Sequence, residues 1–166
     1  MSIELVNRLA LFVVLCAAQI LILNHIHLFN MATPFLIIYF VITFHRNYPK
    51  WAILLWCFTL GLAIDVFSNT PGLAAGSLTL IGALQPYLLE LFIPRDSIEE
   101  LNTSVATLGI WKFSALSIAL ILVFCLLFFA LEAFTFFNWI QWLECVGSSA
   151  VLTYALILAI ESLRRK

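Results

Sequence analysis

Long apolar runs separated by short polar segments dominate the pattern along this chain. A helix that spans a membrane needs about 20 predominantly apolar residues, and five of the runs approach or exceed that length. A sixth run is shorter. We therefore predict six helices, over residues 5–24, 34–44, 51–68, 72–93, 111–133 and 139–163.

The second run is too short to cross a bilayer by itself. At about 1.5 Å per residue, residues 34–44 cover about half of a hydrocarbon core of about 30 Å. Either the helix begins earlier, near Leu28, with Pro34 as a kink, or a short helix is sheltered by its neighbours. Backbone that is not helical survives at membrane depth only where protein or water covers it.

Composition places the chain in the membrane class. Hydrophobic residues make up 64% of the 166 residues and charged residues 10%, and the mean hydropathy is +1.10. Soluble domains are about 45–50% apolar and about 25% charged, so much of this surface must face lipid. No linker rich in Ser, Gly or Pro divides the chain, which indicates a single polytopic transmembrane domain over residues 1–166.

Charge sets the orientation and excludes some partners. If the first helix starts inside, all eight Lys and Arg residues fall in the N-terminus, in the inner segments 45–50 and 94–112, and in the C-terminus. The outer segments 25–33, 69–71 and 134–138 contain none, so both termini are predicted to be cytoplasmic. The net charge of -1 gives no basic field for nucleic acid.

The inner segment 94–112 is the most polar part of the chain. Ser97 and Glu100 fit a capping box, and apolar residues then recur at helical spacing. This pattern predicts a short amphipathic helix along the membrane surface, with a solvated loop as the alternative.

One carboxylate lies inside an otherwise apolar stretch, at Asp65. An aspartate in a span is unfavourable unless it has a partner, and the C-terminal end of a helix carries a negative dipole. The next helix begins a few residues later and offers free N–H groups. Asp65 can therefore bond to Thr70, to the turn amides, or to the first amides of that helix. The segment from Thr70 to Leu73 fits a type II turn, with Pro71 at i+1 and Gly72 at i+2.

Three roles for Asp65 remain open from the sequence. It locks a tight outer hairpin together with the polar turn that contains Asn69, it contacts a partner or ligand on the outer face, or it belongs to a proton or ion relay. Gly61, one turn earlier on the same face, is expected to leave room near the carboxylate. Further along, Gln85 and Pro86 are expected to interrupt and bend the fourth helix in its inner half.

Several other features have structural interpretations. A stripe of small residues on the fourth helix, formed by Gly72, Gly76, Thr79, Gly82 and Ala83, indicates close helix packing. Glu90 and Glu161 lie where the cations at Arg95 and residues 164–166 can pair with them. The four cysteines are isolated in apolar runs, which predicts neither disulfides nor a metal site. No nucleophile elbow, zinc-protease helix or phosphate loop occurs, so we expect no catalytic residue and no cofactor.

A set of short motifs carries a resemblance to a known family. Its parts are Gly61-Leu62-x-x-Asp65, Phe67-Ser68, Thr70-Pro71-Gly72-Leu73 and, about one helix later, Gln85-Pro86-Tyr87. With the length and the six spans, this pattern resembles the rod shape-determining protein MreD family. Gln85 stands where such proteins often carry a basic residue.

The resemblance implies a non-enzymatic inner-membrane subunit of the bacterial cell-elongation (rod) complex. Such proteins support cell shape and lateral peptidoglycan synthesis and work with MreC, the MreB filament, RodA and a penicillin-binding transpeptidase. The fold of the family looks like the S-components of vitamin transporters. The alternative function is therefore an S-component-like transport subunit that binds a small solute.

Overall fold

The computed structural model describes residues 2–22, 33–45, 47–92, 108–133 and 139–164. Within those ranges it contains no strand, and its helices are α1 (Ser2–Leu21), α2 (Ile38–Ile42), α3 (Lys50–Ser68), α4 (Leu73–Phe92), α6 (Ile110–Ala133) and α7 (Trp139–Arg164). Three segments are long and apolar enough to cross a membrane, namely Lys50–Ser68, Ile110–Glu132 and Trp142–Leu163. The chain is therefore a helical membrane protein.

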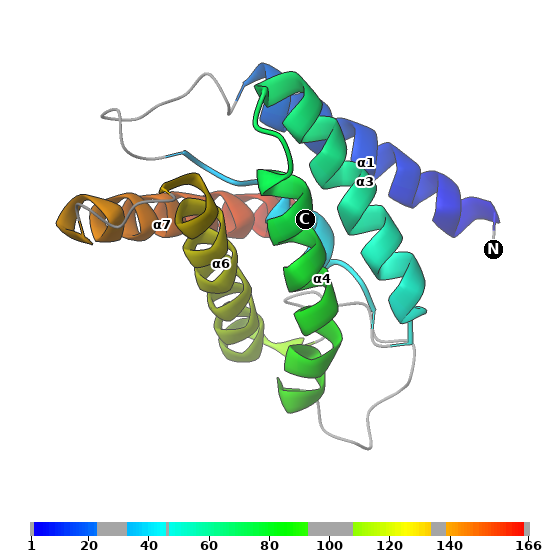
Figure 1. The fold of residues 1–166 in the computed structure, drawn as a ribbon. Helices are drawn as coiled ribbons and strands as arrows, with labels where there is room; N and C mark the ends of the chain where they lie inside the picture. The colour runs from blue at the N-terminus through cyan, green and yellow to red at the C-terminus, as the bar shows by residue number, and fades with distance from the viewer. Residues whose placement is uncertain (1, 23–32, 46, 93–107, 134–138, 165–166) are drawn as a thin grey trace.

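Neighbouring helices in the chain pack on one another. The helices α3 and α4 form an antiparallel hairpin, α4 also packs on α6, and α6 packs on α7. Figure 1 shows α4 between α3 and α6, with α7 crossing behind them and α1 beside α3. The hairpin has two ends: the turn end, where residues 69–72 join the helices, and the opposite end, where α3 starts and α4 finishes.

The short helix α2 lies in the middle of this arrangement, behind α4 in Figure 1. Phe40, Val41, Ile42 and Phe44 are all 0% exposed, and α2 packs against α1, α4 and α6. The aromatic ring of Phe35 adds contacts with three phenylalanine rings of α6, at centroid distances of 4.7 to 6.1 Å. Of the two alternatives left open by the sequence, the structure therefore has the short helix sheltered by its neighbours.

The sequence overestimated how much of this segment is helical. Residues 33–35 are not helical, and the helix covers only Ile38–Ile42 rather than residues 34–44. The reason is that side chains of other helices bond the backbone around Pro34, as described below. We refer to residues 33–44 as the central segment.

Some sequence predictions fall outside the described ranges. The amphipathic helix predicted over 94–112 lies almost wholly in residues that the structure does not describe, as do the segments 25–32 and 134–138. Where the description resumes, Gly109 has a φ of +82° immediately before α6.

Candidate functional site

The carboxylate of Asp65 is buried at the turn end, with 6% of the residue exposed. Its Oδ1 accepts hydrogen bonds from Thr70 Oγ1 at 3.1 Å and from the backbone N–H of Ala74 at 2.9 Å. Its Oδ2 accepts one from the backbone N–H of Ala75 at 2.9 Å. The bonds to Thr70 and to the first amides of the next helix, predicted from the sequence, are confirmed.

These bonds satisfy the start of α4. The first N–H groups of a helix have no acceptor inside the helix. Here the N–H of Leu73 donates to the carbonyl of Thr70 at 3.4 Å, and those of Ala74 and Ala75 donate to Asp65. The first bond within the helix then runs from Gly76 to the carbonyl of Gly72, at 3.0 Å. A negative charge at this positive helix end is also favoured by the helix dipole.

Asp65 also holds the end of α3, through its backbone. Asn69 adopts the left-handed conformation, with φ 56° and ψ 35°, and its N–H donates to the carbonyl of Asp65. The N–H of Thr70 donates to the same carbonyl at 3.2 Å. Asparagine tolerates this conformation better than most residues. One residue therefore caps the end of α3 with its carbonyl and the start of α4 with its side chain.

The turn between the helices has the predicted type. Gly72, at position i+2, has a φ of +84°, and the N–H of Leu73 bonds back to the carbonyl of Thr70. Both observations fit a type II turn. A Cβ at Gly72 would meet no atom within 4 Å, so glycine is needed there for its backbone conformation and not for space.

Gly61 explains how the carboxylate reaches the next helix. A Cβ at Gly61 would lie 2.4 Å from the Cα of Ala75 and 2.7 Å from the carbonyl oxygen of Ala74. The backbones of α3 and α4 are therefore in direct contact one turn from Asp65. The room that Gly61 was predicted to leave near the carboxylate is filled by the backbone of α4. This contact brings the Asp65 carboxylate onto the amides of the same two residues.

The other small residues of the predicted stripe on α4 differ in how closely a neighbouring helix approaches them. A Cβ at Gly82 would meet the sulfur of Cys57 at 2.7 Å, whereas a Cβ at Gly76 would meet only a methyl group of Leu131, at 4.0 Å. Close packing of α4 therefore occurs toward α3, at Ala74, Ala75 and Gly82, and not along the whole predicted stripe.

The surface of the turn end is apolar and exposed. Val66 and Phe67 are 69% and 70% exposed, and Asn69 and Pro71 are also exposed. We call these four residues the corner surface. Because both oxygens of Asp65 are used inside the protein, a partner at this end would meet the corner surface rather than the carboxylate.

Gln85 and Pro86 lie away from this corner. The helix α4 continues through Pro86 to Phe92, so the predicted interruption is wrong. A proline inside a helix removes one hydrogen bond and can kink the helix without ending it, and Pro86 is buried in the bundle. Gln85 is 0% exposed, and its Nε2 donates to the carbonyl of Phe44 at 3.1 Å. Gln85 thus fixes the end of the central segment.

Other polar residues that hold the central segment were missed by the sequence analysis. Gln19 of α1 donates through Nε2 to the carbonyl of Pro34 and accepts through Oε1 from the N–H of Leu36, both at 3.0 Å. The side chain therefore replaces two backbone bonds that a helix would have made. The only sign of this role in the sequence is that Gln19 is an isolated polar residue in an apolar run.

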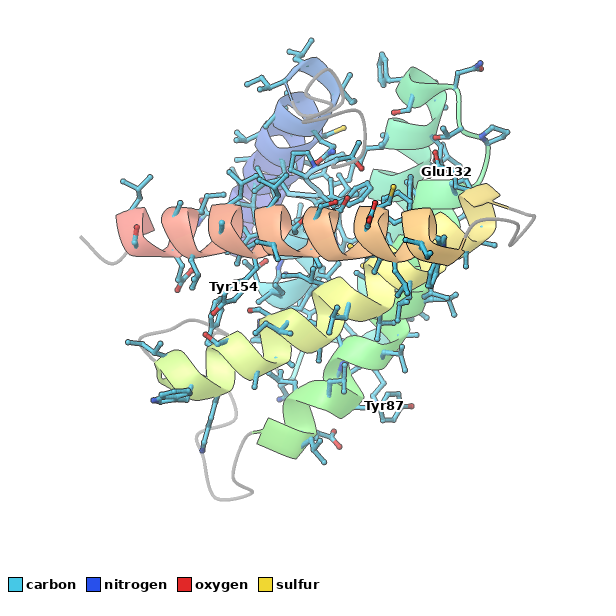
Figure 2. All side chains as sticks on the ribbon, turned by 90° about the vertical axis from the view of Figure 1, so that its left-hand side faces the viewer. Tyr87, Glu132 and Tyr154 are labelled. Carbon is cyan, nitrogen blue, oxygen red and sulfur yellow. The ribbon has the colours of Figure 1, made fainter. Side chains whose placement is uncertain are left out.

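The helix α7 holds the same segment from another side. Ser149 accepts from the N–H of Thr33 at 3.1 Å, and Thr153 accepts from the N–H of Phe35 at 3.0 Å. Their spacing of four residues puts both on one face of α7. The hydroxyl of Tyr39 donates to the carboxylate of Glu161 at 2.9 Å, a partner that the sequence did not predict. Figure 2 shows Tyr154 between α7 and α6, where its hydroxyl lies 2.7 Å from that of Ser114.

The structure thus gathers most of the predicted site residues at one corner. Gly61, Asp65 and residues 69–72 lie together, whereas Gln85 and Pro86 do not join them. Comparison of the chain with protein-family models, with curated protein sequences and with solved structures finds no match.

Proposed function

We propose that the chain is a non-enzymatic inner-membrane subunit of the bacterial cell-elongation complex, of the MreD type. It would cross the membrane six times with both termini in the cytoplasm, in a fold like that of the S-components. It would support cell shape and lateral peptidoglycan synthesis by binding MreC, alongside MreB, RodA and the transpeptidase. The supporting observation is that the motif behind the resemblance, from Gly61 to Gly72, forms one hydrogen-bonded corner.

A stiff corner suits a docking role in a membrane. Lipid tails are as apolar as leucine, so membrane helices associate through packing and polar contacts rather than through the hydrophobic effect. A surface that is already fixed loses less conformational entropy when it binds. Asp65 fixes this corner from inside, and the corner surface presents Val66, Phe67 and Asn69 on the outside.

The predicted orientation is compatible with such a partner. In the topology predicted from the cations, the corner lies on the outer side of the membrane. A single-span partner with a large external part, such as MreC, would reach it there. Asp65 then acts as a positioning residue for the surface and does not itself touch MreC.

The experiment compares a surface change with a matched control in cells that depend on this chain for rod shape. Phe67→Ala removes an exposed ring from the corner surface, and Leu55→Ala removes an exposed side chain elsewhere on α3. Both proteins should reach normal membrane levels. Only Phe67→Ala should lower the amount of MreC that co-purifies and round the cells.

Other results would reject the proposal. Normal MreC recovery and normal shape for a double Val66→Ala, Phe67→Ala variant would exclude the corner as the docking surface. Absence of MreC from the wild-type complex, together with stoichiometric binding of a small solute by the purified protein, would favour the transport subunit instead.

A further inference from the structure

A cation and an aromatic ring meet at the opposite end of the α3–α4 hairpin. The Nζ of Lys50 lies 4.5 Å from the centroid of the Tyr87 ring. Lys50 is the first residue of the candidate span Lys50–Ser68, so it lies where the apolar core of a membrane gives way to headgroups. Among the residues that the structure describes, no carboxylate forms an ion pair with it.

Arg8 is a cation whose charge, unlike that of Lys50, has several partners within the protein. Its guanidinium lies over the rings of Phe44 and Tyr48, at 4.6 and 4.1 Å, and 3.1 Å from Nδ1 of His45. The protein itself therefore surrounds that charge. The ammonium of Lys50, by contrast, lies over the exposed ring of Tyr87.

The surroundings of Lys50 are exposed and aromatic. Trp51 is 72% exposed and Tyr87 is 61% exposed, and Figure 2 shows the Tyr87 ring projecting from α4. Tryptophan, tyrosine and lysine at the end of an apolar span are the residues that sit among lipid headgroups.

We propose that Lys50, Trp51 and Tyr87 form a binding site for the headgroup of an anionic phospholipid. The lysine supplies the charge, the tyrosine ring holds the ammonium at this end of the α3–α4 hairpin, and the tryptophan contacts the lipid at the headgroup level. A lysine near a membrane surface attracts acidic lipids. The Tyr87 ring holds the Lys50 ammonium in one position, so the attraction is directed to a defined place on the surface. The proposal does not depend on the role in cell elongation.

A nearby carboxylate allows a change that should strengthen lipid binding rather than weaken it. Glu90 is exposed on α4, three residues after Tyr87, and it would repel an anionic headgroup. Lys112 is exposed in the first turn of α6, which Figure 1 places near the end of α4. Lys112 is therefore a control of equal charge, because no aromatic ring is found beneath its ammonium within the described part of the chain.

The experiment uses the purified full-length protein in neutral detergent micelles, titrated with phosphatidylglycerol or phosphatidylcholine and read by native mass spectrometry. We expect the wild type to prefer phosphatidylglycerol. Lys50→Gln should weaken its binding about fivefold, which corresponds to about 1 kcal/mol. Tyr87→Leu should also weaken it, Glu90→Gln should strengthen it, and Lys112→Gln should have a clearly smaller effect than Lys50→Gln.

Three results would overturn the site. The first is equal binding of the two lipids by the wild type, and the second is an equal loss for Lys50→Gln and Lys112→Gln, which would indicate general surface charge only. The third is unchanged binding in Tyr87→Leu. Thermal melting of each variant in phosphatidylcholine alone checks that these effects do not come from misfolding.

Discussion

Replacing Asp65 by asparagine tests the hydrogen bonding at the corner with almost no change in shape. The amide has one acceptor oxygen and one NH2 group where the carboxylate has two acceptors. With its oxygen in the place of Oδ1, it keeps the bonds to Thr70 and to the amide of Ala74. Its NH2 then faces the N–H of Ala75, so that two donors point at each other.

The expected loss follows from these contacts. A hydrogen bond to a charged group contributes about 1.5–3 kcal/mol, and a buried donor left without a partner costs about 1–3 kcal/mol. The lost interaction of the charge with the start of α4 adds about 0.3–1 kcal/mol. Because these contributions overlap, we expect Asp65→Asn to lower the free energy of unfolding by about 2–4 kcal/mol.

The assay is reversible unfolding of the purified protein in mixed micelles. Glu144→Gln is the matched control, since it makes the same carboxylate-to-amide change at an exposed position of a span, and its effect should stay within about 0.5 kcal/mol. A double-mutant cycle that pairs Asp65→Ala with Thr70→Val measures the bond between the two side chains, because alanine, unlike asparagine, removes it, and we expect a coupling energy of about 0.5–3 kcal/mol.

Two outcomes would refute this reasoning. One is an Asp65→Asn protein as stable as the wild type, because the two facing donors would then have no energetic consequence. The other is strict additivity of the Asp65→Ala and Thr70→Val changes, which would mean that the bond between the two side chains contributes nothing.

Three further changes can be measured by the same unfolding assay. Gly61→Ala forces α3 and α4 apart and should cost about 1–3 kcal/mol, whereas Gly76→Ala, with open space around it, should be neutral or slightly stabilising; equal effects would refute the close approach. Asn69→Val places a branched residue at φ 56° and should cost about 1–2 kcal/mol, while Asn69→Gly should be tolerated. Gln19→Leu leaves two buried backbone groups without partners and should cost about 2–4 kcal/mol; a loss below about 0.5 kcal/mol would show that the central segment does not need them.

The sequence predicts features that depend on nearby residues. Apolar runs gave the long helices to within a few residues because the length and ends of an apolar run are local properties of the sequence. The corner at Asp65 was also predictable, since its donors come from residues only five to ten positions later. Proline and glycine in the turn left few alternatives for the backbone.

The contacts of the central segment depend on the whole fold and were not predictable. Thr33 and Phe35 bond to residues 116 and 118 positions later in the chain, and nothing local marks those pairs. Glu161 accepts a hydrogen bond from Tyr39, 122 positions earlier in the chain, and this pair too has no local signal, whereas the side chains of residues 164–166, predicted to pair with Glu161, lie outside the described residues. Composition likewise shows that α4 has small residues, but not which of them faces another backbone.

The bonds between the central segment and α7 have a consequence for how the protein is made. Helices enter the membrane in the order of synthesis, and the side chains that complete the backbone bonding of Thr33 and Phe35 belong to the last helix. Uncompensated N–H groups are strongly disfavoured in hydrocarbon. During biogenesis the backbone of this stretch can therefore complete these hydrogen bonds only after α7 has been synthesised and has packed against it.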